Sequence, residues 1–214
     1  MPLPEPTIPK NINVCASMCV IIAQIMKKEI ITITGTLGSG KSSTADLVAK
    51  KLGFGRFSSG DFMRKIAIEM GISLNELSIR AQTDDTIDKK TDGELKRAGQ
   101  QNKIVIDSRL AFNWFPESFK VYLDLPPETA KNRIMDNLRE NKLRRESESS
   151  STPKEIYEKI ISRRQSEEKR YRELYGIDLT DKSNFDLIID TNKNNLEQVV
   201  DIIVEKYKQW REEN

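Results

Sequence analysis

Hydrophobic and polar positions along the chain follow two different periods. Short apolar runs rich in β-branched residues predict buried strands, and longer stretches with helical spacing lie between them. We predict five strands, at 30–34, 54–58, 103–107, 119–125 and 185–190. Strands that alternate with helices favour a parallel sheet joined by right-handed crossovers. The pattern therefore predicts an α/β fold.

The stretches between the strands differ in how much apolar surface they carry. Segment 84–100 is polar and charged, so we predict a small, exposed helical flap over the cleft of the fold. Residues 136–153 are rich in Arg, Glu and Ser and predict a mobile loop between two helices, which we interpret as a lid. The other helices are expected at 41–52, from Ser59 to about 70 and directly after the turn at 71–73. A long helix is expected from the end of the lid to about 175, and a final helix over 196–210.

Composition narrows the class of protein. The 214 residues, 37% hydrophobic and 32% charged, suit one α/β domain with a small appendage. Thirty-five basic and 33 acidic side chains leave a net charge of +2, too balanced for a protein that binds nucleic acid through a basic surface. The chain has no histidine, which excludes Ser-His-Asp catalysis and zinc sites built on histidine. Its chemistry must use Lys, Arg, Asp, Ser and a metal ion.

The first 27 residues differ in character from the rest of the chain. Cys15 and Cys19 are the only cysteines, and we interpret them as ordinary thiols in a reducing, cytoplasmic setting. The apolar run that ends at Met26 is shorter than the ~20 residues that span a bilayer. A well-formed strand-and-helix unit begins after Met26. We therefore expect residues 1–27 to be a dispensable extension, Met26 to be the functional start and residues 28–214 to form the functional domain.

Directly after the first strand and before the first helix, the chain reads G-x-x-x-x-G-K-S. Glycines let the backbone bend so that successive N–H groups converge on phosphate oxygens, and the following helix directs its positive end at the same anion. Lys41 adds a positive charge and Ser42 a hydroxyl for Mg²⁺. The motif therefore predicts a cradle for the phosphates of a nucleotide. Its expected members are Gly35, Thr36, Leu37, Gly38, Ser39, Gly40, Lys41, Ser42 and Ser43.

Neighbouring motifs select among the proteins that use such a cradle. No D-x-x-G occurs in the chain, and 192–195 lacks the Asp on which a guanine-reading motif ends, so a GTPase switch is disfavoured. The strand that ends at Asp107 continues with Ser108 and Arg109, where a hydrolytic ATPase commonly has a Glu that orients water. Because an arginine binds an anion, this position favours transfer to an anionic acceptor over hydrolysis.

Further arginines support an acceptor that carries a phosphate. Arg64 and Arg109 follow strand ends, where an open α/β sheet binds its ligands. Arg163, Glu167 and Arg170 share one face of a helix and could close over phosphates and a sugar or base, or else form a salt-bridged face in solvent. A nucleoside monophosphate, with a second pKa near ~6, is already a dianion at neutral pH. Such an acceptor needs no general base.

Four segments together resemble the cytidylate kinase-like family of nucleoside monophosphate (NMP) kinases. They are Gly35–Ser42, Ser59–Arg64, Val105–Leu110 and Arg163–Asp178, and the resemblance extends over about residues 28–207. It implies a P-loop NTPase fold of three α/β/α layers with a five-stranded parallel sheet, an NMP-binding helical insertion at about 61–102 and a mobile lid at about 136–153. It also implies transfer of a phosphoryl group from ATP, with Mg²⁺, to CMP or dCMP, giving CDP or dCDP.

The resemblance also implies roles for individual residues. Lys41, Arg109, Arg163 and Arg170 would be catalytic, and Ser42 and Asp107 would hold Mg²⁺, Asp107 through water. The acceptor would be bound by Ser59, Gly60, Asp61, Arg64, Arg109, Arg163, Glu167 and Arg170. The expected partners are small-molecule nucleotides, with neither nucleic acid nor membrane, and we expect a monomer.

The sequence departs from the family pattern at two positions. Ser108 stands where the family usually has glycine, and Leu110 where bacterial cytidylate kinases have an acidic residue. The insertion at 61–102 is also shorter than theirs, which leaves selectivity for the base open to UMP or AMP. Two other functions remain alternatives: a kinase of the same fold that acts on a small metabolite alcohol, with Asp61 or Asp107 as base, and a non-catalytic nucleotide-binding module.

Overall fold

A computed structural model describes residues 28–140 and 152–214 of the chain. The predicted N-terminal extension, with Cys15, Cys19 and Met26, lies outside the described residues, as do residues 141–151 of the predicted lid. Over the two described ranges, no helix is long and apolar enough to cross a membrane.

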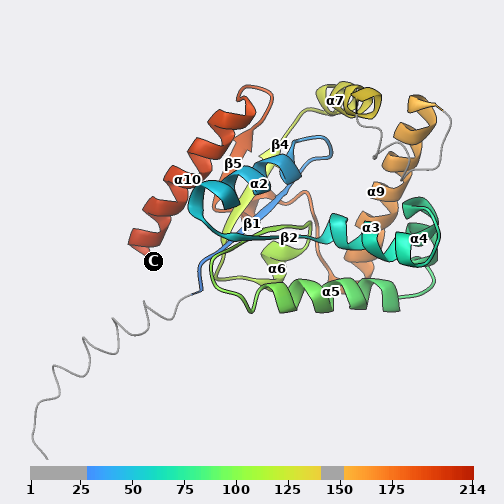
Figure 1. The fold of residues 1–214 in the computed structure, drawn as a ribbon, viewed down its shortest axis with the longest axis horizontal. Helices are drawn as coiled ribbons and strands as arrows, with labels where there is room; N and C mark the ends of the chain where they lie inside the picture. Colours follow the sequence, from blue (N-terminus) through green and yellow to red (C-terminus); the bar gives the residue numbers. More distant parts are fainter. Residues whose placement is uncertain (1–27, 141–151) are drawn as a thin grey trace, which may run out of the picture.

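The described residues form a five-stranded sheet with helices on both faces (Figure 1). The strands lie in the order β2-β3-β1-β4-β5, and every neighbouring pair is parallel. The predicted α/β fold with a five-stranded parallel sheet is therefore confirmed. The strands are β1 (Ile30–Gly35), β2 (Gly55–Ser58), β3 (Ile104–Asp107), β4 (Phe119–Asp124) and β5 (Leu187–Asp190).

Helices give the sheet its outer layers. α2 and α10 pack against each other and cover one face, while α5 and α6 pack on the opposite face. α7 and α9 pack against each other through Ile134 and Ile160. The helices are α2 (Lys41–Leu52), α3 (Ser59–Glu69), α4 (Leu74–Arg80), α5 (Thr86–Ala98), α6 (Ala111–Trp114), α7 (Pro127–Glu140), α9 (Pro153–Tyr175) and α10 (Leu196–Glu213), with a 3-10 turn at Lys182–Asn184.

Alternation along β1 assigns its side chains to the two faces of the sheet. Ile31 and Ile33 are fully buried in the core beneath α2 and α10. Thr32 and Thr34 point the other way and find polar partners there. Thr32 Oγ1 lies 3.2 Å from a serine hydroxyl, and Thr34 Oγ1 donates a 2.8 Å hydrogen bond to the Ser108 carbonyl oxygen. Both faces of this central strand are therefore buried, as expected in a parallel sheet.

The structure corrects the prediction that segment 84–100 is an exposed flap. One face of α5 is buried, because Leu95 and Ala98 pack against β3. Asp88 and Asp92 on the same helix are buried as well. The low apolar content of the segment concealed this face, since two of its inward positions are carboxylates whose partners lie on a distant helix.

Both ends of the predicted lid lie in or next to helices. Residues 136–140 belong to α7, whose charged sequence continues the helix, and α9 begins at Pro153. Thr152 caps α9: its side chain accepts a hydrogen bond from the Glu155 N–H, and the Glu155 carboxylate accepts one from the Thr152 N–H. α7 and α9 therefore take up both ends of the predicted lid.

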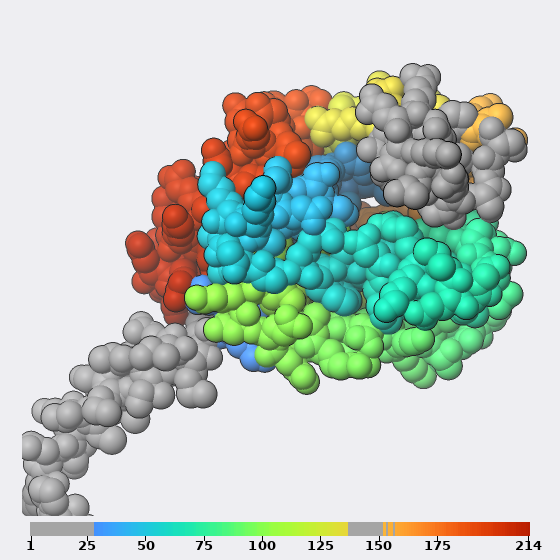
Figure 2. All heavy atoms as spheres, viewed as in Figure 1, coloured from blue at the N-terminus to red at the C-terminus, as the bar shows by residue number. Residues whose placement is uncertain are grey.

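α3, α4 and α5 lie between β2 and β3, where the sequence predicts an insertion. They enclose a small core of their own that includes Ile66, Leu77 and Ile87. α4 begins at a capping box in which Ser73 and Glu76 exchange hydrogen bonds. This agrees with the prediction that a helix follows the turn at 71–73. These helices and α10 lie at opposite ends of the molecule (Figures 1 and 2).

Gly35→Ala is expected to destabilise the fold far more than Gly71→Ala. A Cβ at Gly35, whose φ is +145°, would stand 2.2 Å from the carbonyl oxygen of Leu123 on β4. Gly71 has a φ of +64° but open space around it, so that only a backbone strain of about 1–2 kcal/mol applies. Because Gly35→Ala must also displace backbone, we expect it to cost at least about 3 kcal/mol. Urea unfolding measures both variants, and equal losses would contradict the close packing of β1 on β4.

Candidate active site

The loop between β1 and α2 has the geometry of a phosphate-binding cradle. Gly38 and Gly40 have φ angles of +77° and +84°, which residues with a side chain rarely adopt. Lys41 Nζ donates hydrogen bonds to the carbonyl oxygens of Gly35, at 3.0 Å, and Thr36, at 2.7 Å, and so spans the loop. Among the described residues, no side chain caps α2 and no acidic residue lies in its first turn. The positive end of the helix therefore faces the loop.

The other predicted members of the cradle have separate tasks. Thr36 ties the loop to β4, because its N–H donates to the Leu123 carbonyl oxygen at 2.9 Å. Leu37 packs against the apolar contact between α7 and α9, and Ser43 is exposed. The Ser39 hydroxyl is buried and has no hydrogen-bond partner within 28–140 and 152–214. A buried polar group without a partner costs about 1–3 kcal/mol, which a phosphate oxygen in the loop would offset.

Asp107 meets the loop because β3 is the neighbour of β1. It pairs with Ile33 in the β1–β3 register, at the carboxyl end of both strands. Ser42 Oγ, in the first turn of α2, donates a 2.6 Å hydrogen bond to Asp107 Oδ2. Mg²⁺ takes hard oxygen ligands of this kind together with phosphates of the substrate, so the pair fits a Mg²⁺ ion. The part of the chain that the structure describes contains no group of three or more His, Cys, Asp or Glu residues that could hold a metal by itself.

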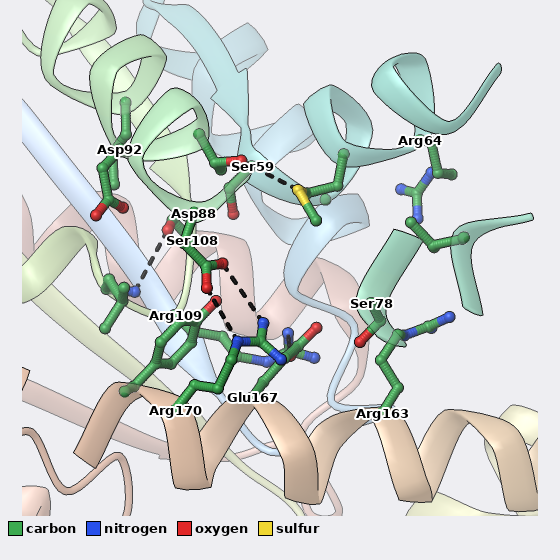
Figure 3. Close-up of a pocket in the computed structure, with 17 residues that line it drawn as sticks. Ser59, Arg64, Ser78, Asp88, Asp92, Ser108, Arg109, Arg163, Glu167 and Arg170 are labelled. Carbon is green, nitrogen blue, oxygen red and sulfur yellow. Dashed lines mark hydrogen bonds and ion pairs between the residues drawn. The ribbon is translucent and has the colours of Figure 1, made fainter. Parts of the chain in front are cut away.

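A cavity of about 120 Å³ opens beside this edge, walled by α3, α4, α5, the residues after β3 and α9 (Figure 3). In Figure 3, Arg163 and Arg170 rise toward it from α9, and Asp88 and Asp92 come from the α5 side. Every residue predicted to bind the acceptor lines this cavity except Asp61. Its apolar walls are Met63, Leu74, Leu95, Leu110 and Tyr171.

Arg109 and Glu167 form an ion pair between the end of β3 and α9. Burial by itself lowers the pKa of Arg109, but the nearby Glu167 and Tyr171 outweigh it, and the pKa is raised. Sequence reasoning overlooked Arg164, whose Nε lies 2.5 Å from Glu168 Oε1. Burial and the nearby Arg109 lower the pKa of Arg164. Two arginines close enough to repel each other favour an anion in this region.

Arg170 is the most deeply engaged of the predicted arginines. Its Nε and Nη2 lie 2.9 Å and 3.4 Å from the two carboxylate oxygens of Asp88, and its Nη1 lies 3.1 Å from Ser166 Oγ. The side chains of Arg170 and Asp88 are 9% and 6% exposed. The pair therefore joins α9 to α5 in the wall of the cavity.

Asp61 holds a neighbouring arginine in place. Its carboxylate lies 2.5 Å from Arg64 and 2.8 Å from Arg56. Burial raises the pKa of Asp61, but these two arginines outweigh it, so the pKa lies below its usual value. Arg64 lines the cavity and Asp61 does not. Asp61 thus positions Arg64, a cation of the site. Arg56, which no sequence motif marked, pairs with the same carboxylate.

Sequence reasoning also missed the polar groups that α4 and α5 supply. Asp92 accepts a 2.6 Å hydrogen bond from the Tyr175 hydroxyl. Burial raises the pKa of Asp92, and the neighbouring Asp88 raises it further, against the lowering effect of that hydrogen bond. Ser78 is buried on α4 and lines the cavity, without a hydrogen-bond partner in the described residues. The one available signal was the spacing of Asp88, Asp92 and Leu95, which places all three on one helix face.

A phosphate loop joined to an arginine-walled cavity at the carboxyl edge of a parallel sheet defines a phosphotransferase of the P-loop class. More closely, the chain belongs to the cytidylate kinase-like family, whose sequence profile matches residues 30–193.

Individual relatives extend over most of the chain. It is 35% identical to a cytidylate kinase of Haloquadratum walsbyi over 178 residues, which cover 81% of this chain and 86% of that protein. It is 34% identical to a cytidylate kinase of Methanocaldococcus jannaschii over 180 residues, covering 81% and 94%. It is 30% identical over 183 residues to an S-adenosylmethionine-dependent nucleotide dehydratase of Lacinutrix mariniflava, covering 85% of this chain but 36% of that protein.

Solved structures support the fold. A shikimate kinase from Bacteroides thetaiotaomicron has a TM-score of 0.57 and 15% sequence identity, over 85% of this chain and 99% of that chain. A shikimate kinase from Aquifex aeolicus has a TM-score of 0.51 and 19% identity, over 84% and 96%.

Asp88→Ala is expected to lower the free energy of unfolding by about 3–5 kcal/mol, because it leaves Arg170 charged and buried without its partner. The double variant Asp88→Leu/Arg170→Met removes both charges and should recover most of that loss. Denaturant unfolding of the two variants measures the difference. If Asp88→Ala keeps the stability of the wild type, the pair does not hold α5 to α9.

Proposed function

We propose that the protein transfers the γ-phosphoryl group of ATP to the phosphate of CMP or dCMP, giving ADP and CDP or dCDP. The observation that carries the proposal is the set of Arg64, Arg109 and Arg163 around one cavity, beside the strand end that holds Asp107 against Ser42. Three cations at one cavity suit the doubly charged phosphate of a nucleoside monophosphate. The relatives named cytidylate kinase support CMP as the acceptor.

On the donor side, the N–H groups of the loop and Lys41 bind the β- and γ-phosphates of ATP. Ser42, and Asp107 through water, would hold Mg²⁺, and the ion would neutralise charge on the phosphates. The buried Ser39 hydroxyl donates a hydrogen bond to a phosphate oxygen. Together these residues orient the γ-phosphate toward the acceptor cavity.

On the acceptor side, Arg64, Arg109 and Arg163 hold the attacking phosphate, and Glu167 positions Arg109. Arg170 lines the same cavity but donates to Asp88 and Ser166, so we assign it to positioning the α5 wall. The acceptor attacks as a dianion, because its second pKa is near ~6, and no general base is required. This agrees with a chain that has no histidine.

The division of the chain follows from these roles. We assign the catalytic domain to residues 28–214 and the NMP-binding insertion to about 61–102, since α3, α4 and α5 supply one wall of the acceptor cavity. All residues assigned to either substrate lie within that domain.

The first test is ADP production from MgATP by the purified protein, offered CMP, dCMP, UMP, AMP, GMP or no acceptor in parallel. We expect turnover with CMP or dCMP and little without an acceptor, because the site is built for transfer. Turnover with UMP or AMP alone would assign another nucleotide as acceptor. ADP formation that is independent of acceptor would replace transfer by hydrolysis, and ATP binding without turnover would indicate a binding module.

Arg109→Ala is expected to lower kcat/KM for the acceptor strongly while ATP affinity stays nearly unchanged. A lost charge-assisted hydrogen bond costs about 1.5–3 kcal/mol, which corresponds to roughly 10- to 150-fold in rate. Steady-state kinetics and ATP titration measure the two effects. Arg172→Ala is the matched control, because Arg172 lies on α9 outside the cavity and its side chain is 69% exposed. An equal loss of ATP affinity in Arg109→Ala would refute the acceptor role.

A further inference from the structure

The acceptor cavity is lined by two chemically opposite sets of side chains. Arg64, Arg109 and Arg163 supply positive charge, and Asp88 and Asp92, one helical turn apart on α5, supply two carboxylates (Figure 3). Both carboxylates are buried, with Asp88 5% and Asp92 9% exposed. An acceptor that places its phosphate against the arginines must present a group of different character to the carboxylates. That group must donate hydrogen bonds, because a carboxylate only accepts them.

The two carboxylates differ in what they already contact. Asp88 is paired with Arg170 through both of its oxygens. Asp92 forms no ion pair within 4.0 Å in the described residues, and its Oδ2 accepts a hydrogen bond from the Tyr175 hydroxyl at 2.6 Å. Burial and the nearby Asp92 raise the pKa of Tyr175, so this hydroxyl remains a donor. The Trp114 indole also lies near Asp92 and lowers its pKa, but a carboxylate has about four acceptor sites, so Asp92 keeps lone pairs for a ligand.

The protein holds Asp92 in a setting that disfavours its charge. Burial raises the pKa of Asp92, and Asp88 on the same helix adds to this effect, while the hydroxyl of Tyr175, the charge of Lys96 and the indole of Trp114 act against it. Because burial disfavours the charge of Asp92, the need to fill space between α5 and α9 does not explain a carboxylate at this position. A carboxylate of this kind on a cavity wall is typical of a residue kept for its ligand.

We infer that Asp92 reads the base of the acceptor by accepting a hydrogen bond from an exocyclic amine, which cytosine carries and uracil lacks. Uracil would direct a carbonyl oxygen at the carboxylate, and two acceptors facing each other leave both without a partner. Leu95 and Leu110 provide apolar walls for the ring of the base. The inference rests on the proposed function.

The test compares CMP with UMP, which share size and charge and differ at the group assigned to Asp92. We expect the wild type to prefer CMP by roughly 100-fold or more in kcat/KM. Asp92→Asn should reduce this preference at least about tenfold, because an amide can also donate to the uracil carbonyl. Glu94→Gln is the control on the same helix: Glu94 pairs with Arg97, lies outside the cavity and should leave the preference unchanged.

The Tm of Asp92→Asn gives a second measurement, because the inference predicts a higher Tm and a purely structural role predicts a lower one. Asn keeps an acceptor for the Tyr175 hydroxyl and removes the disfavoured charge, so Asp92→Asn should raise the Tm of the free protein. A lower Tm together with an unchanged CMP-to-UMP ratio would overturn the inference and make Asp92 a structural residue.

Calorimetric titration of CMP and UMP separates this inference from the proposed function. If the wild type transfers phosphate to neither nucleotide but binds CMP well above UMP, and Asp92→Asn removes that difference, the proposed function fails and the inference stands. If the wild type phosphorylates CMP and Asp92→Asn leaves the preference unchanged, the function stands and the inference fails.

Discussion

The pairing of β1 with β3 is the constraint on which the site depends. It places the end of β1, where the phosphate loop begins, beside Asp107. The 2.6 Å hydrogen bond between Ser42 and Asp107 follows from that register, and a slip of one residue would turn Asp107 to the other face of the sheet. Because the strands are parallel, residues that follow β2 and β3, such as Ser59 and Arg109, reach the same edge.

Buried polar contacts organise the acceptor side. Asp88 with Arg170 and Asp92 with Tyr175 join α5 to α9 one helical turn apart. A buried ion pair contributes little net stability, yet removing one partner is costly, so such a pair favours one relative placement of the two helices. The same contacts keep two carboxylates in a cavity that also contains arginines. Asp88, Asp92 and Arg170 thus both join the two helices and line the cavity that we propose for the acceptor.

The structure agrees with sequence reasoning where neighbours along the chain decide the outcome. The five strands, the glycine conformations of the phosphate loop and the capping box at Ser73 all depend on residues within a few positions of each other. The prediction that segment 84–100 is exposed is wrong, because the low apolar content of the segment does not reveal its buried face. Its inward face contains Asp88 and Asp92, which are buried because α9 supplies their partners.

By itself, the sequence determined the order of the elements, the phosphate loop and most of the charged residues that line the acceptor cavity, since all of these follow from periodicity and short motifs. Tertiary structure alone decided how charges distant in the sequence meet: Asp88 pairs with Arg170, and Asp92 faces the cavity without a salt bridge in the described part of the chain. The partners of Asp88 and Asp92 lie 82 and 83 residues away. Such contacts depend on how whole helices pack, and no local pattern of residues encodes that packing.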